Sequence, residues 1–240
     1  MLNRLVPVKR IVCERRAFSA DLYSFAQLSG ADFVAVAKRD ELNSLVVAPG
    51  SVGLSCGFGL IFTGRHIAAF EHGIWNIHYG KLPDIRGRHP ISWAFLRGDD
   101  RFYVSIHQVS EEIDKGLLLA QDWVPRDLND TEAQVREKIE TKLEQGLLKE
   151  ALENYRQGRH IELDDGTYYP SLNQRFDNVA PSEHDSKFLF NLFRSQAFYG
   201  GVTVDGENRR ECVFFHPEFG EHYEQHAIYE CRDGVKVAIK

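Results

Sequence analysis

With 240 residues, a formal net charge of -6 and 43% hydrophobic residues, the chain has the composition of a soluble globular protein, with room for one medium-sized domain or for one domain with a modest appendage. The negative charge and the lack of a long basic run argue against a nucleic-acid partner, because such proteins usually present a basic face to phosphates. No stretch is long and apolar enough to span a bilayer, and the start of the chain lacks a signal peptide's apolar core, so we expect a cytoplasmic protein with no membrane partner.

The four cysteines are too widely spaced for a disulfide scaffold, and no CxxC pair occurs. A stretch near the end of the chain nevertheless gathers five side chains of metal-binding types, namely Cys212, His216, His222, His226 and Cys231. Their spacing matches no standard zinc finger, and the alternation around them predicts strands whose histidines face water. We therefore expect no bound metal.

Strand-like and helix-like segments alternate along the first 158 residues. In chain order, the pattern predicts a strand at 9–14, a helix at 18–28 with Ser19 or Asp21 as its cap, strands at 32–38 and 51–58, a short helix at 67–71, a strand at 73–79, a helix at 91–98, a strand at 102–109 and a long helix at 131–157. Strands that alternate with helices indicate an α/β fold, here a Rossmann-like layer with a mostly parallel sheet.

The character of the chain changes after Gly158. Residues 158–181 are irregular and rich in turn formers, residues 182–197 have helical spacing, and the remainder is strand-like, with turns at Asp205-Gly206 and Asp233-Gly234. We therefore expect a catalytic domain at 1–158 and a small α+β appendage, with a helix and β-hairpins, at 159–240.

Polar residues and chain-breaking residues follow the apolar strand at 73–79, in the run NIHYGKLPDIRG. Residues i and i+2 of a strand face the same side, so Asn76 and His78 point together, while Trp75 and Ile77 point toward the core. The carboxyl end of a strand in an open α/β sheet is where ligands bind. An isolated N-x-H pair is usually a turn cap beside a surface histidine, so the pair alone does not establish a site.

Further motifs give this pair a context. A leucine-proline loop follows it, with Arg86-Gly87 and Pro90, and an Asp-x-Gly loop follows 36 residues after His78, at Asp114-Lys115-Gly116. Together these segments resemble the folate-dependent formyltransferases over about residues 51–158. The resemblance implies a formyltransferase fold for the amino-terminal domain.

The resemblance also implies a catalytic trio of Asn76, His78 and Asp114. Moving a formyl group from N10-formyltetrahydrofolate to an amine is acyl transfer, and it requires no metal. His78 would act as general base and then acid, and Asn76 would donate a hydrogen bond to the developing oxyanion. Asp114 would orient the imidazole and support its charged form.

Two loops carry the expected contacts to the folate co-substrate. The glycine-containing loop after the strand at 51–58 resembles the family's pterin-framing loop, and the acidic loop before Gly116 resembles the one that closes over that ring. The residues concerned are Phe58, Gly59, Leu60, Ile61, Glu111, Glu112, Ile113 and Asp114. Phe58, Leu60 and Ile61 are also plausible core residues.

The acceptor amine is less determined, because Tyr79-Gly80-Lys81 departs from the sequence of many relatives. Methionyl-tRNA formyltransferases carry a basic carboxyl-terminal domain that is not evident here, and glycinamide ribonucleotide transformylases would leave the tail without a role. Nucleotide-linked amino-sugar N-formyltransferases, which serve bacterial surface-polysaccharide (O-antigen, lipopolysaccharide) synthesis, resemble the run from His78 to His89 and the aromatic tail. The alternatives that remain are another formyl-folate enzyme (a glycinamide ribonucleotide or methionyl-tRNA formyltransferase, or a formyl-folate hydrolase) and a catalytically dead binding protein of the same fold.

A sugar nucleotide requires cations near its diphosphate and flat rings near its base. The expected acceptor residues are Tyr79, Lys81, Arg86, Arg88, Tyr168 and Tyr169. The resemblance also favours a homodimer, whereas the apolar tail could equally pack on its own domain.

Overall fold

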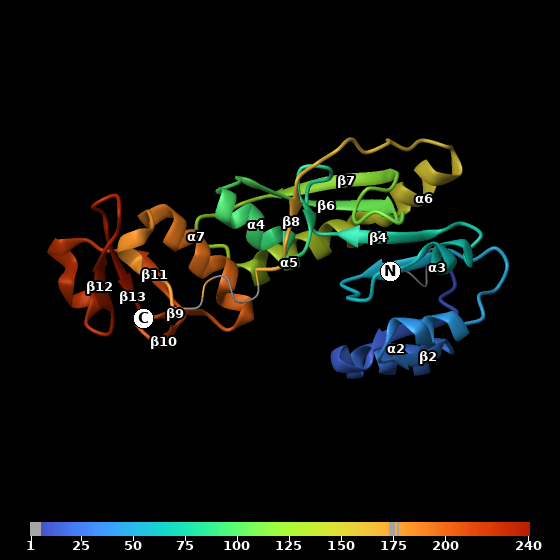
Figure 1. Cartoon of the computed structure of the whole chain (residues 1–240), viewed down its shortest axis with the longest axis horizontal. Helices are drawn as coiled ribbons and strands as arrows, with labels where there is room; N and C mark the ends of the chain where they lie inside the picture. The colour runs from blue at the N-terminus through green and yellow to red at the C-terminus, as the bar shows by residue number, and fades with distance from the viewer. Residues whose placement is uncertain (1–5, 173–175, 177) are drawn as a thin grey trace. The chain divides into compact units, whose positions relative to one another are not determined.

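The computed structural model describes residues 6–172, 176 and 178–240. Figure 1 shows the course of the chain, which divides into two compact units. The first contains the described residues up to His78 together with Ser105–Gln121 and Leu143–Asp165, and the second contains Tyr79–Val104, Asp122–Lys142 and the described residues from Gly166 onward. Both units draw on residues before 158, whereas the sequence predicted a division into 1–158 and 159–240, which stays a prediction.

The first unit begins with a β-α-β element, seen in blue in Figure 1. Strands β1 (Arg10–Glu14) and β2 (Asp32–Val36) are parallel, and helix α2 (Ala20–Ser29) connects them. Ser19 caps the helix, because its Oγ accepts a hydrogen bond from the backbone N–H of Leu22 at 3.3 Å. Gly30, at φ 70°, ends it in the left-handed conformation that glycine adopts without strain. The predicted strands, helix and cap are confirmed.

A four-stranded sheet carries the polar motifs. Its order is β3-β4-β6-β7, where β3 is Gly53–Cys56, β4 is Ile74–His78, β6 is Arg101–Gln108 and β7 is Leu118–Pro125. Helix α3 (Gly64–Ala68) connects β3 to β4, which are parallel, and β4 and β6 are antiparallel. The predicted α/β fold is confirmed, and the antiparallel pair of β4 and β6 makes the sheet mixed.

The long predicted helix is not continuous. Helix α5 (Glu132–Lys142) and helix α6 (Leu148–Arg156) are separated by a π-helical turn at Leu143–Leu147, inside which Gly146 has φ 122°. The prediction of one helix at 131–157 is therefore wrong. A glycine tolerates a positive φ that other residues avoid, and the interruption separates a helix of the second unit from a helix of the first.

The second unit combines helices with short strands. Helices α4 (Pro90–Arg97) and α7 (Ser186–Gln196) pack against each other, and β5 (Arg86–Gly87) pairs in parallel with β8 (Tyr168–Tyr169). The tail holds the hairpin of β9 (Val202–Val204) and β10 (Glu207–Arg209) and a sheet of order β11-β13-β12, made of β11 (Cys212–Phe214), β12 (Ala227–Glu230) and β13 (Lys236–Ile239). Short 3-10 segments lie at Arg15–Ala17, Arg39–Ser44, Pro181–Glu183, Ala197–Tyr199 and Pro217–Tyr223.

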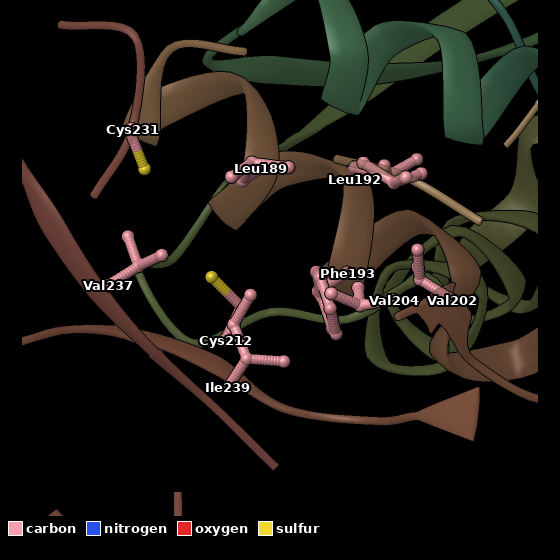
Figure 2. Packing of buried hydrophobic residues seen from close by; sticks show 10 residues of the cluster. Leu189, Leu192, Phe193, Val202, Val204, Cys212, Cys231, Val237 and Ile239 are labelled. Carbon is pink, nitrogen blue, oxygen red and sulfur yellow. The ribbon is translucent and has the colours of Figure 1, made fainter. Parts of the chain in front are cut away.

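The tail has a hydrophobic core of its own, shown in Figure 2. Side chains from α7 point toward side chains from the strands after Gly201. The buried members are Val179, Leu189, Leu192, Phe193, Val202, Val204, Cys212, Cys231, Val237 and Ile239. The predicted helix, strands and turns of the tail are confirmed, and Asp205 and Gly206 both take the positive φ of a tight hairpin turn. In the part of the chain that the structure describes, no helix is long and apolar enough to cross a membrane.

Candidate active site

Strand β4 places Asn76 and His78 on one face of the sheet, as the alternation of the strand predicts. Between and before them, Ile77 and Trp75 are buried on the opposite face, where the Trp75 ring lies 5.1 Å from the Tyr155 ring of α6. His78 is itself only 6% exposed. The imidazole therefore lies in a protected environment, where electrostatic interactions are stronger than in water.

Strand β6 runs antiparallel beside β4 and adds a second histidine. The register pairs Asn76 with His107 and His78 with Ser105. His107 is 1% exposed, and its Nε2 lies 3.4 Å from the Asn76 amide nitrogen Nδ2. The sequence did not single out His107 as a site residue.

Asp114, in the loop between β6 and β7, lies near both histidines. Its Oδ2 is 3.7 Å from His78 Nδ1, and its Oδ1 is 3.5 Å from His107 Nε2. These distances fit ion pairs rather than short hydrogen bonds, so the carboxylate favours whichever imidazole carries a positive charge. The trio expected from the sequence, Asn76, His78 and Asp114, is thus brought together in the first unit.

The loop requires a glycine at position 116, two residues after Asp114. A Cβ at Gly116 would overlap the backbone carbonyl oxygen of Gln108, so the loop can approach the end of β6 only without a side chain there. The same turn is fixed by a hydrogen bond from Gln108 N to the Leu117 carbonyl at 2.8 Å. The close approach allows Asp114, at φ 52°, to reach back to the histidines.

The two loops expected to hold the folate also belong to the first unit. Phe58 stacks on Phe62 with ring centroids 5.6 Å apart, and the backbone N–H of Gly59 donates to the buried Glu14 carboxylate at 2.6 Å. Gly59, Leu60 and Ile61, with Arg39 and Asp40, line a cavity of about 330 Å³.

The acidic loop contacts the segment that follows this cavity wall. A Cβ at Gly64 would overlap the Glu111 carboxylate, so the two loops meet there. Glu112 pairs with Lys115 at 3.2 Å, Lys115 also pairs with Asp165 at 2.7 Å, and Ile113 is exposed. The expected folate residues therefore form two neighbouring loops with exposed apolar side chains, an arrangement that suits a flat aromatic ligand.

The residues expected to bind the acceptor belong to the second unit. The pairing of β5 with β8 places Arg86 opposite Tyr168, and the backbone N–H of Arg88 donates to the Tyr169 carbonyl at 3.2 Å. The Tyr169 ring also lies 4.9 Å from the Trp93 ring. Two segments about 80 residues apart in sequence thus bring arginines and tyrosines together, and their role in binding an acceptor stays a prediction.

Tyr79 and Lys81 have partners within the same unit. The Arg136 guanidinium lies 5.6 Å from the Tyr79 ring centroid. Lys81 pairs with Asp84 at 2.7 Å, and this hydrogen bond raises the pKa of Lys81, which stays positively charged at neutral pH.

Comparison with known proteins determines the family. Residues 15–152 match the profile of the family described as Formyl transferase, which is more than half of the chain. The chain belongs to the formyl transferase family. The resemblance noted from the motifs is confirmed.

One curated member of the formyl transferase family matches part of this chain. Human mitochondrial methionyl-tRNA formyltransferase is 30% identical over 149 residues, which cover 60% of this chain and 38% of that enzyme. The chain therefore spans well under half the length of this curated relative.

Solved structures of the formyl transferase fold match nearly the whole chain. The sugar 3N-formyl transferase WlaRD has a TM-score of 0.70 at 17% identity, covering 96% of this chain and 86% of that chain. An N-formyltransferase from Helicobacter canadensis has a TM-score of 0.67 at 15% identity, covering 97% and 99%. At these identities the likeness shows the fold.

The second unit contains a polar network that was not predicted from the sequence. Glu132 has no exposed side-chain surface and accepts hydrogen bonds from Ser92 Oγ at 2.5 Å, Arg136 Nη2 at 2.6 Å and Tyr199 OH at 2.9 Å. Burial, with a smaller contribution from Glu132, raises the pKa of Tyr199 to about 12. The only signal in the sequence was a glutamate at the start of a helix, a position that usually faces water.

Within the described ranges, no three His, Cys, Asp or Glu side chains come together as a metal ion would require. In the stretch from Cys212 to Cys231, both cysteines are buried in the tail core, and burial raises the pKa of the Cys212 thiol to about 12.

Proposed function

We propose that this formyl transferase family member moves the formyl group of N10-formyltetrahydrofolate to the amine of a nucleotide-linked amino-deoxysugar. The observation that carries the transfer reaction is the grouping of Asn76, His78 and Asp114, with Asp114 within 3.7 Å of His78 Nδ1. The activity is that of an acyl-transfer enzyme, with the folate as co-substrate and no metal in the reaction as proposed.

In the proposed mechanism, His78 removes a proton from the acceptor amine as the amine nitrogen bonds to the formyl carbon. The formyl oxygen takes up the displaced electron pair, and Asn76 Nδ2 donates a hydrogen bond to it. His78 then returns its proton to the departing folate nitrogen as the carbon–nitrogen bond breaks. Asp114 stabilises the imidazolium between these two proton transfers.

The folate fits the two loops of the first unit. The stacked Phe58 and Phe62 rings, the cavity lined by Gly59, Leu60 and Ile61, and the exposed Ile113 offer apolar contact to a flat ring. Glu111 and Glu112 belong to the loop that would lie against this ring. The solved structures of WlaRD and of the Helicobacter canadensis enzyme contain 5-N-formyl-THF and folinic acid respectively, which supports this proposal.

The proposed class of acceptor is supported by two solved structures that match nearly the whole chain. The two sugar-modifying neighbours were solved with dTDP and with dTDP-3-aminofucose, and they match 96% and 97% of this chain, tail included. Arg86 and Arg88, with Lys81, would pair with a diphosphate, and Tyr168, Tyr169 and Tyr79 would offer rings to the sugar nucleotide.

Transfer to methionyl-tRNA is the second candidate, favoured by the 30% identity to the human mitochondrial enzyme. The match covers 60% of this chain, and the net charge of -6 disfavours binding to a polyanion. A formyl-folate hydrolase or an inactive binding protein of the same fold would contain the same two folate loops.

A panel assay tests the proposal. The protein is incubated with N10-formyltetrahydrofolate and dTDP-, UDP- or GDP-linked amino sugars, glycinamide ribonucleotide or methionyl-tRNA, and mass spectrometry scores the gain of one formyl group. We expect formylation of a sugar nucleotide, with Arg86→Ala and Arg88→Ala raising KM more than they lower kcat and the exposed control Lys149→Ala changing neither. Formylation of methionyl-tRNA or glycinamide ribonucleotide alone would reject the sugar acceptor. Release of tetrahydrofolate without any acceptor would indicate a hydrolase, and no turnover under any condition an inactive protein.

A further inference from the structure

His107 is a buried histidine to which the proposed mechanism gives no task. It lies on β6 opposite Asn76, with 1% of its surface exposed, and no atom of it transfers a proton in the steps above. Both of its ring nitrogens nevertheless have partners. Its Nδ1 is 2.9 Å from the carbonyl oxygen of Gln108, and its Nε2 is 3.4 Å from Asn76 Nδ2.

These two contacts define which nitrogen of His107 carries the proton. A carbonyl oxygen can only accept a hydrogen bond, so Nδ1 must be the donor to Gln108. A neutral imidazole with its proton on Nδ1 has a bare Nε2, which can only accept. The Asn76 amide nitrogen is therefore the donor in the second contact.

The direction of this hydrogen bond has a consequence for Asn76. The oxygen and nitrogen ends of an asparagine amide have nearly the same shape, and the torsion that exchanges them is broad. A bare Nε2 attracts the nitrogen end and repels the oxygen end. The amide nitrogen has two hydrogens, so one N–H on His107 leaves the other to donate elsewhere.

We propose that His107 is a positioning residue that holds the Asn76 amide with its nitrogen, not its oxygen, toward the reacting formyl oxygen. The inference rests on the proposed function for the identity of that oxygen. Without His107, the amide can rotate and turn its own oxygen toward the developing negative charge, where it repels instead of donating.

Asp114 distinguishes this role from the obvious alternative. Its Oδ1 is 3.5 Å from the same His107 Nε2, but a bare nitrogen has no proton to give it. The carboxylate charge therefore remains for His78, whose Nδ1 lies 3.7 Å from the other oxygen. In the alternative, a protonated His107 would pair with Asp114 and weaken its support of His78.

The first test needs no turnover. Nitrogen-15 NMR of the resting protein, with His107→Gln used to assign the signals, should show His107 with a protonated Nδ1 and a bare Nε2. The chemical shift of the Asn76 side-chain amide should change in the His107→Leu variant. A protonated Nε2, or an Asn76 amide that does not respond, would overturn the proposal even if the protein formylates nothing.

The second test is kinetic. His107→Leu should lower kcat by about 10-fold, less than the ~10²–10³-fold of removing the donor itself, and leave both KM values unchanged. His107→Gln, which keeps one donor and one acceptor, should restore most of the loss. The control His72→Leu removes a histidine of the same unit that contacts Tyr155 OH, and it should leave kcat unchanged.

A double-mutant cycle identifies the residue through which His107 acts. In an Asn76→Ala background, His107→Leu should cause no further loss of kcat, whereas in an Asp114→Asn background it should cause its full loss. The reverse pattern would assign His107 to the carboxylate and overturn the proposal. Failure of the wild-type enzyme to use formyl-folate would reject the proposed function, while the NMR result would still decide the geometry of Asn76 and His107.

Discussion

Asn76 and His78 lie two residues apart on one strand, so a single element presents the proposed oxyanion donor and the proposed base to the same side. Such a pair needs only one further group, a carboxylate, and the loop after β6 brings Asp114 to it. Chemistry that depends on the relative position of these groups therefore tolerates few changes at the three positions.

Replacement of the trio gives the most direct check of the mechanism. His78→Asn should remove most of the turnover, because the attacking amine loses its base, and Asn76→Ala should lower kcat by ~10²–10³-fold through loss of the oxyanion donor. Saturation kinetics measures both, with circular dichroism as the control for folding. A folded His78→Asn variant with near-normal kcat would contradict the mechanism.

Gly116→Ala tests the close approach that places Asp114. The added methyl group would overlap the Gln108 carbonyl oxygen, so the loop must shift. We expect a loss of about 1–3 kcal/mol in the free energy of unfolding, together with a fall in kcat, both as measured on the purified variant by urea titration and steady-state kinetics. Gly220→Ala, where a Cβ would meet nothing within 4 Å, is the matched control. Equal behaviour of the two variants would mean that the loop adapts freely.

The residues of the site were predictable from the sequence to unequal degrees. The motifs N-x-H and Asp-x-Gly identified Asn76, His78 and Asp114, because each motif is local and its order matches that of a family. His107 was missed because its partnership with Asn76 depends on the antiparallel register of β4 and β6, which no local pattern encodes. The signal available was weak: Ser105 and His107 share the polar face of a strand whose other face holds the fully buried Val104 and Ile106.

At the scale of secondary-structure elements, α5 and α6 show how a regular pattern can hide a break. The apolar positions of residues 131–157 continue across Gly146 with helical spacing, so the sequence predicts one helix. The π-helical turn adds backbone but leaves Leu147 and Leu148 in the core. The spacing of the apolar residues therefore does not reveal the break. The short pair β5 and β8 was missed for a related reason, since two residues are too few to show a period.

Glu132 at the start of α5 stabilises the second unit by joining Ser92 of α4 to Arg136 and Tyr199. Glu132→Ala leaves the Arg136 guanidinium and the hydroxyls of Ser92 and Tyr199 without this acceptor. We expect a loss of about 3 kcal/mol in the free energy of unfolding, at the low end for a broken buried pair because the Arg136 side chain remains 31% exposed.

Denaturant unfolding measures this loss, and Glu137→Ala on the same helix, whose side chain is exposed, is the control. Tyr199→Phe should cost less than Glu132→Ala, since it removes one neutral donor and leaves the Arg136 ion pair in place. A Glu132→Ala variant as stable as the control would show that the network contributes nothing to folding.

At the scale of the whole molecule, we expect the buried Cys212 to make the free energy of unfolding depend on pH in the alkaline range. Burial raises the pKa of this thiol to about 12, whereas in the unfolded chain it ionises near its ordinary value of about 8.5. Between these values the unfolded state releases a proton that the folded state retains. The free energy of unfolding should therefore fall as pH rises above about 9, by at most ~1.4 kcal/mol per pH unit from this group.

Urea titrations at several pH values measure the slope, and Cys212→Ala should make it shallower. Native iodoacetamide labelling at pH 8 gives an independent check, because exposed Cys56 should react while Cys13, Cys212 and Cys231 react only after unfolding. Labelling of Cys212 in the native protein would contradict the account.

Homodimer formation stays a prediction at this scale. Large apolar side chains remain exposed on the second unit, among them Phe198, Phe214, Phe219 and Ile228. Covering such side chains is a common outcome of association. Light scattering at micromolar concentration should give a dimer mass, and a monomer mass would refute the prediction.

The interleaving of the two units limits how this protein can be divided. The chain changes unit after His78, Val104, Gln121, Lys142 and Asp165, so neither unit corresponds to a continuous stretch of the gene. A deletion that removes everything after Asp165 would take only part of the second unit and leave its other two segments without their core. A single crossover between two relatives, at any position, would therefore build at least one of the units from segments of both parents.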